Sequence, residues 1–182
     1  MYVELKNINK TYGDYQASND VNFSIEQGKL VGLLGPSGSG KTTILRILVG
    51  LQAPTSGKIF KDDQEITGLA PDKRGMGIVF QNYALFPNMT VAQNICVVPK
   101  LLKYDKARCD EIVQEMLQLV HMEQYANKYP SELSGGQQQR IGVLRALAAS
   151  PPIVLMDEPF SALDPLTREA LQDEVKNLQQ KL

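Results

Sequence analysis

The stretch LVGLLGPSGSGKT, residues 30–42, decides the fold. Its first five residues, Leu30 to Leu34, form a short run that is apolar on both sides, which is typical of a buried parallel strand. The residues from Lys41 to Val49 predict a helix that stops at Gly50, a residue well suited to a left-handed helix end. A glycine-rich turn between a buried strand and a helix predicts a site for phosphate.

The turn itself fits the pattern G-x-x-x-x-G-K-[ST] from Gly35 to Thr42. Its glycines let the backbone curl so that several N–H groups point at phosphate oxygens, and the following helix adds its positive dipole end. Lys41 brings a charge to the β- and γ-phosphates, and Thr42 offers a hydroxyl to Mg²⁺. The alternative is a flexible linker, which would not stand between an apolar strand and a helix.

A second half of the site follows a later apolar run. Ile153 to Met156 predicts a buried strand, and Asp157 emerges at its carboxyl end, where open parallel sheets bind ligands. Asp157 can hold Mg²⁺ through its water shell, and Glu158 can polarise an attacking water. The alternative is an ordinary acidic pair that ends a strand before Pro159. Together with the phosphate loop, the acidic pair indicates a nucleotide site.

The rest of the chain predicts a mixed α/β architecture. Alternation of apolar and polar residues, at Val3 and Leu5 and again from Val21 to Ile25, predicts antiparallel strands in the first thirty residues. Gly77 to Phe80 predicts another buried strand. Strands that alternate with helices favour a mostly parallel sheet.

Between the later strands, the chain from Pro87 to Pro130 is mainly helical in pattern. Ile112, Val113, Met116, Leu117 and Val120 recur at helical spacing, which predicts an amphipathic helix in an inserted helical subdomain. A last helix is expected from Asp164 and Pro165, with an apolar stripe that runs to Leu182. That stripe indicates a chain cut within an element, the alternative being a natural terminal helix.

Composition excludes several classes of protein. The 182 residues carry 19 Lys and Arg against 20 Asp and Glu, so charge gives no reason to expect a nucleic-acid partner. No apolar run approaches the roughly 18 residues that span a bilayer, and the start is not a signal peptide. Cys96 and Cys109 match no metal or disulfide spacing and are expected to be ordinary thiols in a cytoplasmic protein. Any membrane role therefore comes through a partner.

The segment Leu133-Ser134-Gly135-Gly136-Gln137 completes an ordered set of motifs. Ser134 and Gln137 fit a capping box, and the two glycines leave a bare helix N-terminus, which is a second anion site. A plain cap would not explain the glycines. With these motifs, essentially the whole chain resembles the nucleotide-binding subunit of ABC transporters.

The resemblance implies a P-loop NTPase fold: an α/β protein with a RecA-like parallel sheet core, an N-terminal antiparallel β subdomain and an inserted α-helical subdomain. Residues 1–182 are then a single ATPase domain that is incomplete at the C-terminus. Residues 1–86 and 131–182 form the catalytic core with its β subdomain, and 87–130 form the helical subdomain. The family's switch histidine lies on a further strand; His121 matches no family position.

The resemblance also implies roles for single residues. Glu158 matches the catalytic base, and Gln81 the glutamine that reaches Mg²⁺ and the attacking water. Mg²⁺ would be held by Thr42, Gln81 and Asp157. Tyr12 matches the aromatic residue that stacks on adenine, although an exposed strand-end tyrosine is as plausible. The residues that would bind ATP are Tyr12, Gly35, Pro36, Ser37, Gly38, Ser39, Gly40, Lys41, Thr42, Thr43, Ser134, Gly135, Gly136 and Gln137.

Partners follow from the same resemblance. Two chains, head to tail, would sandwich two ATP molecules, with Ser134 to Gln137 of one chain facing the γ-phosphate bound to the other. Ser161 to Asp164 would communicate across this homodimer. Gln81 to Pro87 resembles the segment that meets an integral membrane permease, the alternative being a satellite core. The subunit would lie on the cytoplasmic face of the membrane, and a solute-binding protein would be an indirect partner.

The expected function is the ATPase of an importer. Residues 97–182 look most like the ATPases of glycine betaine and other quaternary-amine osmoprotectant importers. Residues 70–91 look more like those of sugar, polyamine and iron importers. A truncated fragment that binds ATP without turnover is a further alternative. An ABC ATPase of DNA repair or translation is disfavoured, because the chain has neither a coiled-coil insertion nor paired cassettes.

Overall fold

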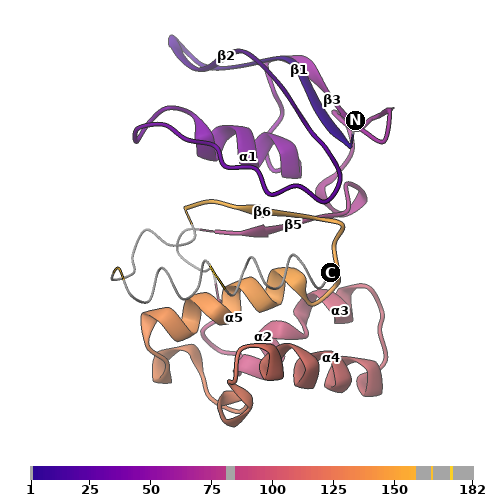
Figure 1. The fold of residues 1–182 in the computed structure, drawn as a ribbon, viewed down its shortest axis with the longest axis vertical. Helices are drawn as coiled ribbons and strands as arrows, with labels where there is room; N and C mark the ends of the chain where they lie inside the picture. Colours follow the sequence, from indigo (N-terminus) through magenta and orange to yellow (C-terminus); the bar gives the residue numbers. More distant parts are fainter. Residues whose placement is uncertain (1, 81–84, 159–164, 166–172, 174–182) are drawn as a thin grey trace. The chain divides into compact units, whose positions relative to one another are not determined.

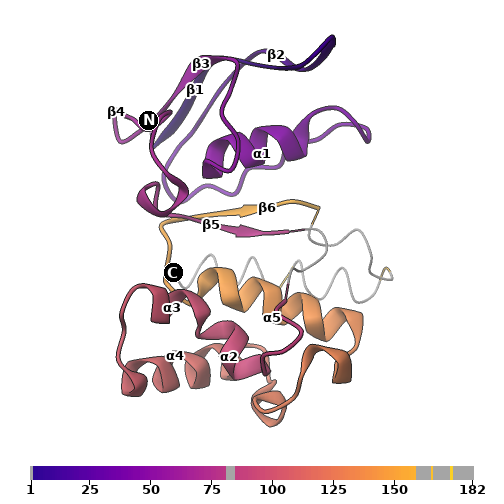
Figure 2. The same ribbon diagram turned by 180° about the vertical axis from the view of Figure 1, so that it is seen from behind.

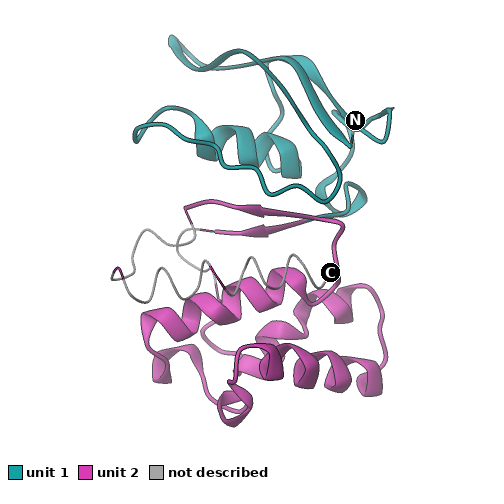
Figure 3. Ribbon diagram, in the orientation of Figure 1, with its two compact units in different colours: residues 1–76 teal, residues 77–182 magenta. Residues whose placement is uncertain are grey.

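The computed structural model describes residues 2–80, 85–158, 165 and 173. The chain divides into two compact units, residues 1–76 and 77–182 (Figure 3). Each unit is described by itself below. The expected last helix from Asp164 to Leu182 lies outside the described residues apart from two isolated positions.

The first unit is built on a four-stranded sheet with the order β2-β1-β3-β4 (Figure 1). Its strands are β1 (Val3–Tyr12), β2 (Tyr15–Ile25), β3 (Ser56–Lys61) and β4 (Gln64–Glu65). β1 pairs antiparallel with both β2 and β3, which confirms the expected antiparallel start of the chain. The apolar positions of β1 are buried, because the inner face of the sheet forms the core of this unit.

Helix α1 (Lys41–Val49) has the predicted bounds. It ends at Gly50, whose φ of 88° is left-handed, as expected for a glycine at this position. The guanidinium of Arg74, 3% exposed, donates to the carbonyl oxygens of Ile47 and Leu48, each at 2.8 Å. The Ile47 carbonyl also accepts from the Gly50 N–H at 3.2 Å, so Arg74 adds a second donor there and supplies one to the Leu48 carbonyl at the end of the helix. Burial lowers the pKa of Arg74 from its ordinary value.

The segment from Leu30 to Leu34 is not the buried strand expected from its sequence. The structure assigns it no strand, and Leu30, Val31 and Leu34 are 63%, 48% and 96% exposed. A strand forms only where its N–H and C=O groups pair with a neighbour. Among the described strands of the first unit, none pairs with this segment.

The second unit contains the strand pair β5 (Met76–Val79) and β6 (Ile153–Met156), of which β5 begins at the last residue of the first unit. β6 has the predicted bounds, and β5 begins and ends one residue earlier than expected. Helix α5 (Gly135–Leu147) packs on this pair, with Val79, Val143 and Leu147 in one buried cluster. In both views α5 lies between the strand pair and the remaining helices (Figures 1 and 2).

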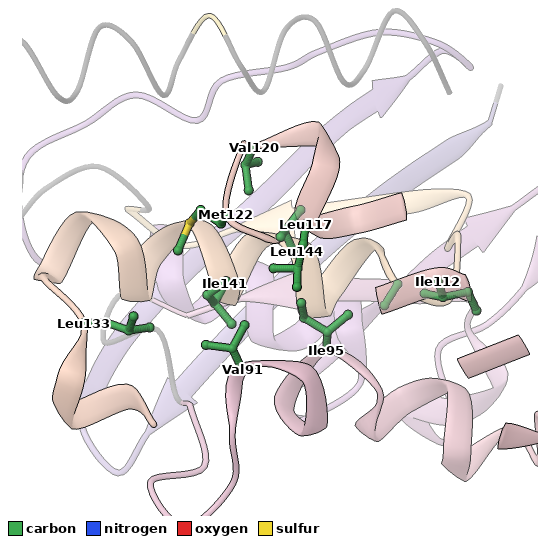
Figure 4. Close-up of a cluster of buried hydrophobic side chains, with 10 residues drawn as sticks. Val91, Ile95, Ile112, Leu117, Val120, Met122, Leu133, Ile141 and Leu144 are labelled. Carbon is green, nitrogen blue, oxygen red and sulfur yellow. The ribbon is translucent and has the colours of Figure 1, made fainter. Parts of the chain in front are cut away.

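Those helices are α2 (Val91–Ile95), α3 (Val97–Leu101) and α4 (Lys106–Leu119), followed by 3-10 turns at Glu123–Tyr125 and Pro130–Glu132. The expected amphipathic helix is therefore α4. The face of α5 that points away from the strands packs against α2 and α4 and forms a second core with them (Figure 4). That core consists of Val91, Ile95, Ile112, Leu117, Val120, Met122, Leu133, Ile141, Leu144 and Ala148. Among the described residues no helix is long and apolar enough to cross a bilayer.

Candidate nucleotide-binding site

The glycine-rich loop leads directly into α1. Gly40 stands at the N-cap position with a left-handed φ of 87°, and a Cβ there would collide with the carbonyl oxygen of Ala17. Only glycine fits this position without strain. The first turn of α1 carries no acidic side chain, and its cap residue has no side chain to accept a hydrogen bond. The helix N-terminus thus keeps its positive end available to an anion.

Lys41 lies over this loop. Its ammonium nitrogen donates to the carbonyl oxygens of Gly35 and Pro36, at 2.8 and 2.9 Å, and approaches Ser39 Oγ at 3.4 Å. The loop residues from Gly35 to Ser39 are exposed, whereas Thr42 and Thr43 are half-buried in the first helical turn. Three groups of hydrogen-bond donors therefore lie together here: the exposed backbone loop, the uncapped start of α1 and the Lys41 ammonium. Together they form a donor set that fits a polyphosphate.

Tyr12 lies at the tip of the hairpin formed by β1 and β2. It is paired with Tyr15 across the turn, and the Tyr15 hydroxyl donates to the carbonyl oxygen of Gly38 at 3.3 Å. The ring of Tyr12 is 43% exposed, and the Lys10 ammonium lies 5.1 Å from its centroid. The hairpin tip therefore borders the glycine-rich loop. Sequence reasoning missed Tyr15; the signal that could have found it is the two-residue turn Gly13-Asp14, which sets Tyr15 opposite Tyr12.

The acidic pair ends β6 as expected. The Asp157 N–H donates to the carbonyl oxygen of Val79 at 2.9 Å, so Asp157 continues the pairing of β5 and β6. Asp157 is 6% exposed. Glu158 is exposed and has a left-handed φ of 47°. Non-glycine residues adopt this conformation uncommonly. The two carboxylates therefore occupy different environments at one strand end.

The glycine-containing segment before α5 forms the expected capping box. The Gln137 N–H donates to Ser134 Oγ at 3.3 Å, and the Ser134 N–H donates to Gln137 Oε1 at 2.8 Å. A Cβ on Gly135 would meet no atom within 4 Å, so the backbone of this first turn is open to approach. The neighbouring Gln138 amide donates to the carbonyl oxygens of Pro130 and Leu133, at 3.0 and 3.2 Å, which fixes the chain that leads into the helix.

A buried asparagine, which the sequence did not single out, fixes the segment that begins α2. Asn94, 0% exposed, accepts from the Phe86 N–H at 2.8 Å and donates to the carbonyl oxygens of Phe86 and Met89 at 3.1 and 3.0 Å. The guanidinium of Arg145 on α5 lies 5.5 Å from the centroid of the Phe86 ring. Phe86 is 44% exposed, so it is an apolar side chain held in place at the surface.

The predicted site residues fall into three groups. Tyr12 and the loop from Gly35 to Thr43 lie in the first unit. Ser134 to Gln137, Asp157 and Glu158 lie in the second. Gln81 and the segment from Ser161 to Asp164 lie outside the described residues. His121 follows α4 and is exposed, in agreement with a surface position in the helical segment.

Each unit carries one oxygen group of a kind that Mg²⁺ takes. This ion keeps several waters and binds proteins through one or two oxygen ligands in addition to substrate phosphates. The first unit offers the Thr42 hydroxyl and the second the Asp157 carboxylate, each described within its own unit. No cluster of three or more His, Cys, Asp or Glu residues occurs in the described ranges, so nothing there suggests a metal held by the protein alone.

Known proteins resemble this chain over nearly all of its length. It is 52% identical over 182 residues to the choline transport ATP-binding protein OpuBA of Bacillus subtilis, covering 98% of this chain and 48% of that protein. It is 48% identical to the spermidine/putrescine import ATP-binding protein PotA of Chromobacterium violaceum, covering 99% and 50%. A probable sulfate/thiosulfate import ATP-binding protein CysA of Chlorella vulgaris is 45% identical, covering 100% and 77%. The chain thus spans about half the length of the first two of these curated relatives.

Solved structures agree with these relatives. A dimeric post-hydrolysis state of the ATP-binding cassette MJ0796 bound to ADP and Pi superposes with a TM-score of 0.86 and 38% identity, covering 98% of this chain and 83% of that one. The fold is therefore that of a P-loop ATPase cassette, with an antiparallel N-terminal sheet, as expected from the sequence. The family model described as ABC transporter matches residues 18–161. Since that match covers most of the sequence, the chain belongs to the ABC transporter family.

Proposed function

We propose that the chain is the ATP-binding and ATP-hydrolysing cassette of an ABC importer. The observation that carries this proposal is the loop from Gly35 to Ser39, exposed, at the start of an uncapped helix and with the Lys41 ammonium over it. Asp157 and Glu158 at the end of β6 supply the acidic groups that hydrolysis requires.

Binding begins with a change of partner at Lys41. Its ammonium now bonds the carbonyl oxygens of Gly35 and Pro36, and it would turn from them to the β- and γ-phosphate oxygens of ATP. The N–H groups at the start of α1 would bind the same phosphates, and Tyr12 would stack on the adenine. Thr42, Gln81 and Asp157 would hold Mg²⁺, which neutralises charge on the transferred phosphoryl group when bound.

Hydrolysis is the attack of a water molecule on the γ-phosphate. Glu158 would accept the proton of that water, with Gln81 holding it in line. The capping box fixes Ser134 to Gln137 as a rigid first turn, and we assign it to the γ-phosphate held by a second copy. A head-to-tail homodimer is therefore the active form. The relative MJ0796 is described as dimeric, which supports this assembly.

The membrane partner would dock on the second unit. Phe86 presents an exposed ring held by Asn94 and Arg145. A hollow of about 390 Å³ between the start of α4 and the chain after α5 adds a second feature, with Ile112 and Met116 among its walls and charged Arg108 and Glu115 among its lining residues. An apolar anchor and a charged recess suit a helix of a permease. A solute-binding protein would act on that permease, and the cassette would sit at the cytoplasmic face of the membrane.

We infer an osmoprotectant such as glycine betaine or choline as the solute. Relatives named for choline and for glycine betaine, carnitine and choline transport are 52% and 50% identical to this chain. Polyamine and sulfate relatives are nearly as similar, at 48% and 45%. Because the cassette does not bind the solute, uptake must be measured. In cells lacking the gene, restoring it should restore uptake of labelled choline or glycine betaine; restored spermidine uptake instead would favour the polyamine alternative.

The ATPase proposal is tested on the protein as its gene encodes it. Lys41→Ala should abolish binding of Mg·ATP by calorimetry, and Glu158→Gln should bind it but release phosphate far more slowly, at a low residual rate. Equal binding by Lys41→Ala and the unchanged protein would refute the proposed site. Phosphate release by the 182-residue chain decides whether this stretch alone turns over or only binds, and Glu158-dependent release excludes the binding-only alternative.

A further inference from the structure

Gln139, a buried glutamine of α5, keeps both of its polar atoms unpaired. It is 0% exposed, and within the part of the chain that the structure describes neither its Oε1 nor its Nε2 atom has a hydrogen-bond partner. Burying an amide without replacing its hydrogen bonds to water is unfavourable. Such a group in a native protein needs an explanation, and a use of its hydrogen bonds in another state of the molecule is one.

The position of Gln139 follows from the packing of α5 on β5. A Cβ on Gly77 would lie 2.8 Å from the carbonyl oxygen of Ala146, and two residues later Val79 packs with Val143. β5 therefore runs towards the N-terminus of α5. Gln139 comes one helical turn before Val143, on the same face of the helix. It accordingly lies towards the carboxyl end of β5.

The acidic pair lies at that same end. Asp157 bonds the carbonyl oxygen of Val79, so β6 ends level with the last residue of β5. Glu158 follows, exposed and with its left-handed φ of 47°. Asp157 is buried and is assigned to Mg²⁺, whereas the turn at Glu158 holds a rarely populated conformation that a change of state can relax.

We propose that Gln139 is a positioning residue for Glu158. In the ATP-loaded protein the Gln139 Nε2 atom donates a hydrogen bond to the Glu158 carboxylate. In the nucleotide-free protein the Gln139 amide is buried and has no such acceptor among the described residues. The inference rests on the proposed ATPase function. An amide N–H to a carboxylate is a charge-assisted bond, stronger than one between neutral groups. It would hold the carboxylate of the general base in one orientation towards the attacking water.

The first test measures the stability of the full-length protein and its variants towards urea in the absence of nucleotide. Gln139→Met replaces the amide by an apolar side chain of similar size. It should leave the unfolding midpoint in urea unchanged or raise it, because no hydrogen bond is lost. Gln138→Met is the matched control: the same substitution, one residue earlier, removes the bonds to Pro130 and Leu133 and should lower the midpoint.

Kinetics give the second test. With saturating Mg·ATP, Gln139→Met should lower kcat roughly 10- to 100-fold, as expected for the loss of one hydrogen bond to a charged group, with KM changed less than about 3-fold. In a Glu158→Gln background the same substitution should lower the remaining rate less than about 2-fold, since the group that Gln139 holds is already gone.

The outcomes separate the two proposals. If Gln139→Met lowers the unfolding midpoint without nucleotide as Gln138→Met does, the amide is paired in the resting protein and the inference is wrong. An unchanged kcat, or a full 10-fold effect in the Glu158→Gln background, also overturns it. If instead the unchanged protein releases no phosphate from Mg·ATP, the ATPase function itself falls. If Glu158→Gln releases phosphate at the rate of the unchanged protein, Glu158 is not the base and the role given to Gln139 falls with it.

Discussion

The side chain of Asn94 and the backbone of Phe86 bond each other twice: the Phe86 N–H donates to Asn94 Oδ1 at 2.8 Å, and Asn94 Nδ2 donates to the Phe86 carbonyl oxygen at 3.1 Å. The same amide nitrogen also bonds the carbonyl oxygens of Met89 and Thr90. One buried side chain thereby satisfies the backbone of a whole turn. The exposed ring of Phe86 owes its fixed position to this amide and to Arg145.

Replacing Asn94 by Ala should therefore destabilise the protein strongly. The change removes these partly buried hydrogen bonds, which costs about 3 kcal/mol of the free energy of unfolding. Urea denaturation measures the loss. Gln93→Ala is the control from the same helix: its exposed side chain bonds only the Thr90 N–H, so about 0.5–1 kcal/mol is expected. Equal losses in the two variants would contradict the role given to Asn94.

Arg74 provides a matching test in the first unit. Its guanidinium donates to four carbonyl oxygens, those of Ile47, Leu48, Thr67 and Leu69. Arg74→Met keeps much of the stem but removes the guanidinium donor from all four acceptors, of which Ile47 keeps the Gly50 N–H, and should cost about 3 kcal/mol. Arg46→Ala removes an exposed cation from the last turn of the same helix and should cost no more than about 0.5 kcal/mol. A larger loss from Arg46→Ala than from Arg74→Met would show that charge, and not the hydrogen bonds, closes this helix.

Gly40 should resist substitution for two reasons that act together. Alanine would have to adopt its left-handed φ of 87°, and the new Cβ would collide with the carbonyl oxygen of Ala17. We expect Gly40→Ala to cost about 1–3 kcal/mol of stability and to abolish Mg·ATP binding measured by calorimetry. Gly32→Ala is the control, because a Cβ there meets no atom within 4 Å and its φ is ordinary. Normal ATP affinity in Gly40→Ala would show that the loop tolerates a shifted backbone.

Local interactions explain which elements could be predicted from the sequence. The bounds of α1 and the capping box at Ser134 and Gln137 were correct, because each depends on residues only a few positions apart. The bounds of β6 were also correct, because β5 supplies the partner that this strand needs. The expected strand from Leu30 to Leu34 was wrong, because a strand depends on a partner that its own residues do not supply. The apolar pattern of residues 30–34 does not indicate whether a partner strand is present.

The same reason limits what could be predicted of the site. The glycine-rich loop and the acidic pair are recognisable as motifs, because the residues that carry their chemistry are consecutive in the sequence. Tyr15 reaches Gly38 from 23 positions away, and Arg145 reaches Phe86 through the fold of the second unit. A lone Tyr or Arg in the sequence carries no sign of such a contact. Gln139 was likewise hidden among three consecutive glutamines, of which only the packing shows that one is buried and unpaired.

Cys96 should be unreactive in the folded protein. Both cysteines are buried, and burial followed by the neighbouring Cys109 thiol raises the pKa of Cys96 to about 12. The thiolate is the reactive form, so iodoacetamide at pH 8 should label Cys96 slowly in the native protein and rapidly in urea, as followed by mass spectrometry of the peptides. Because the folded pKa lies above the unfolded value of about 8.5, the stabilisation linked to this thiol is complete below pH 8.5 and is lost as the pH rises towards 12. The unfolding midpoint should fall over that range and fall less in Cys96→Ala. Rapid native labelling at pH 8 would show that the thiol is neither buried nor held protonated.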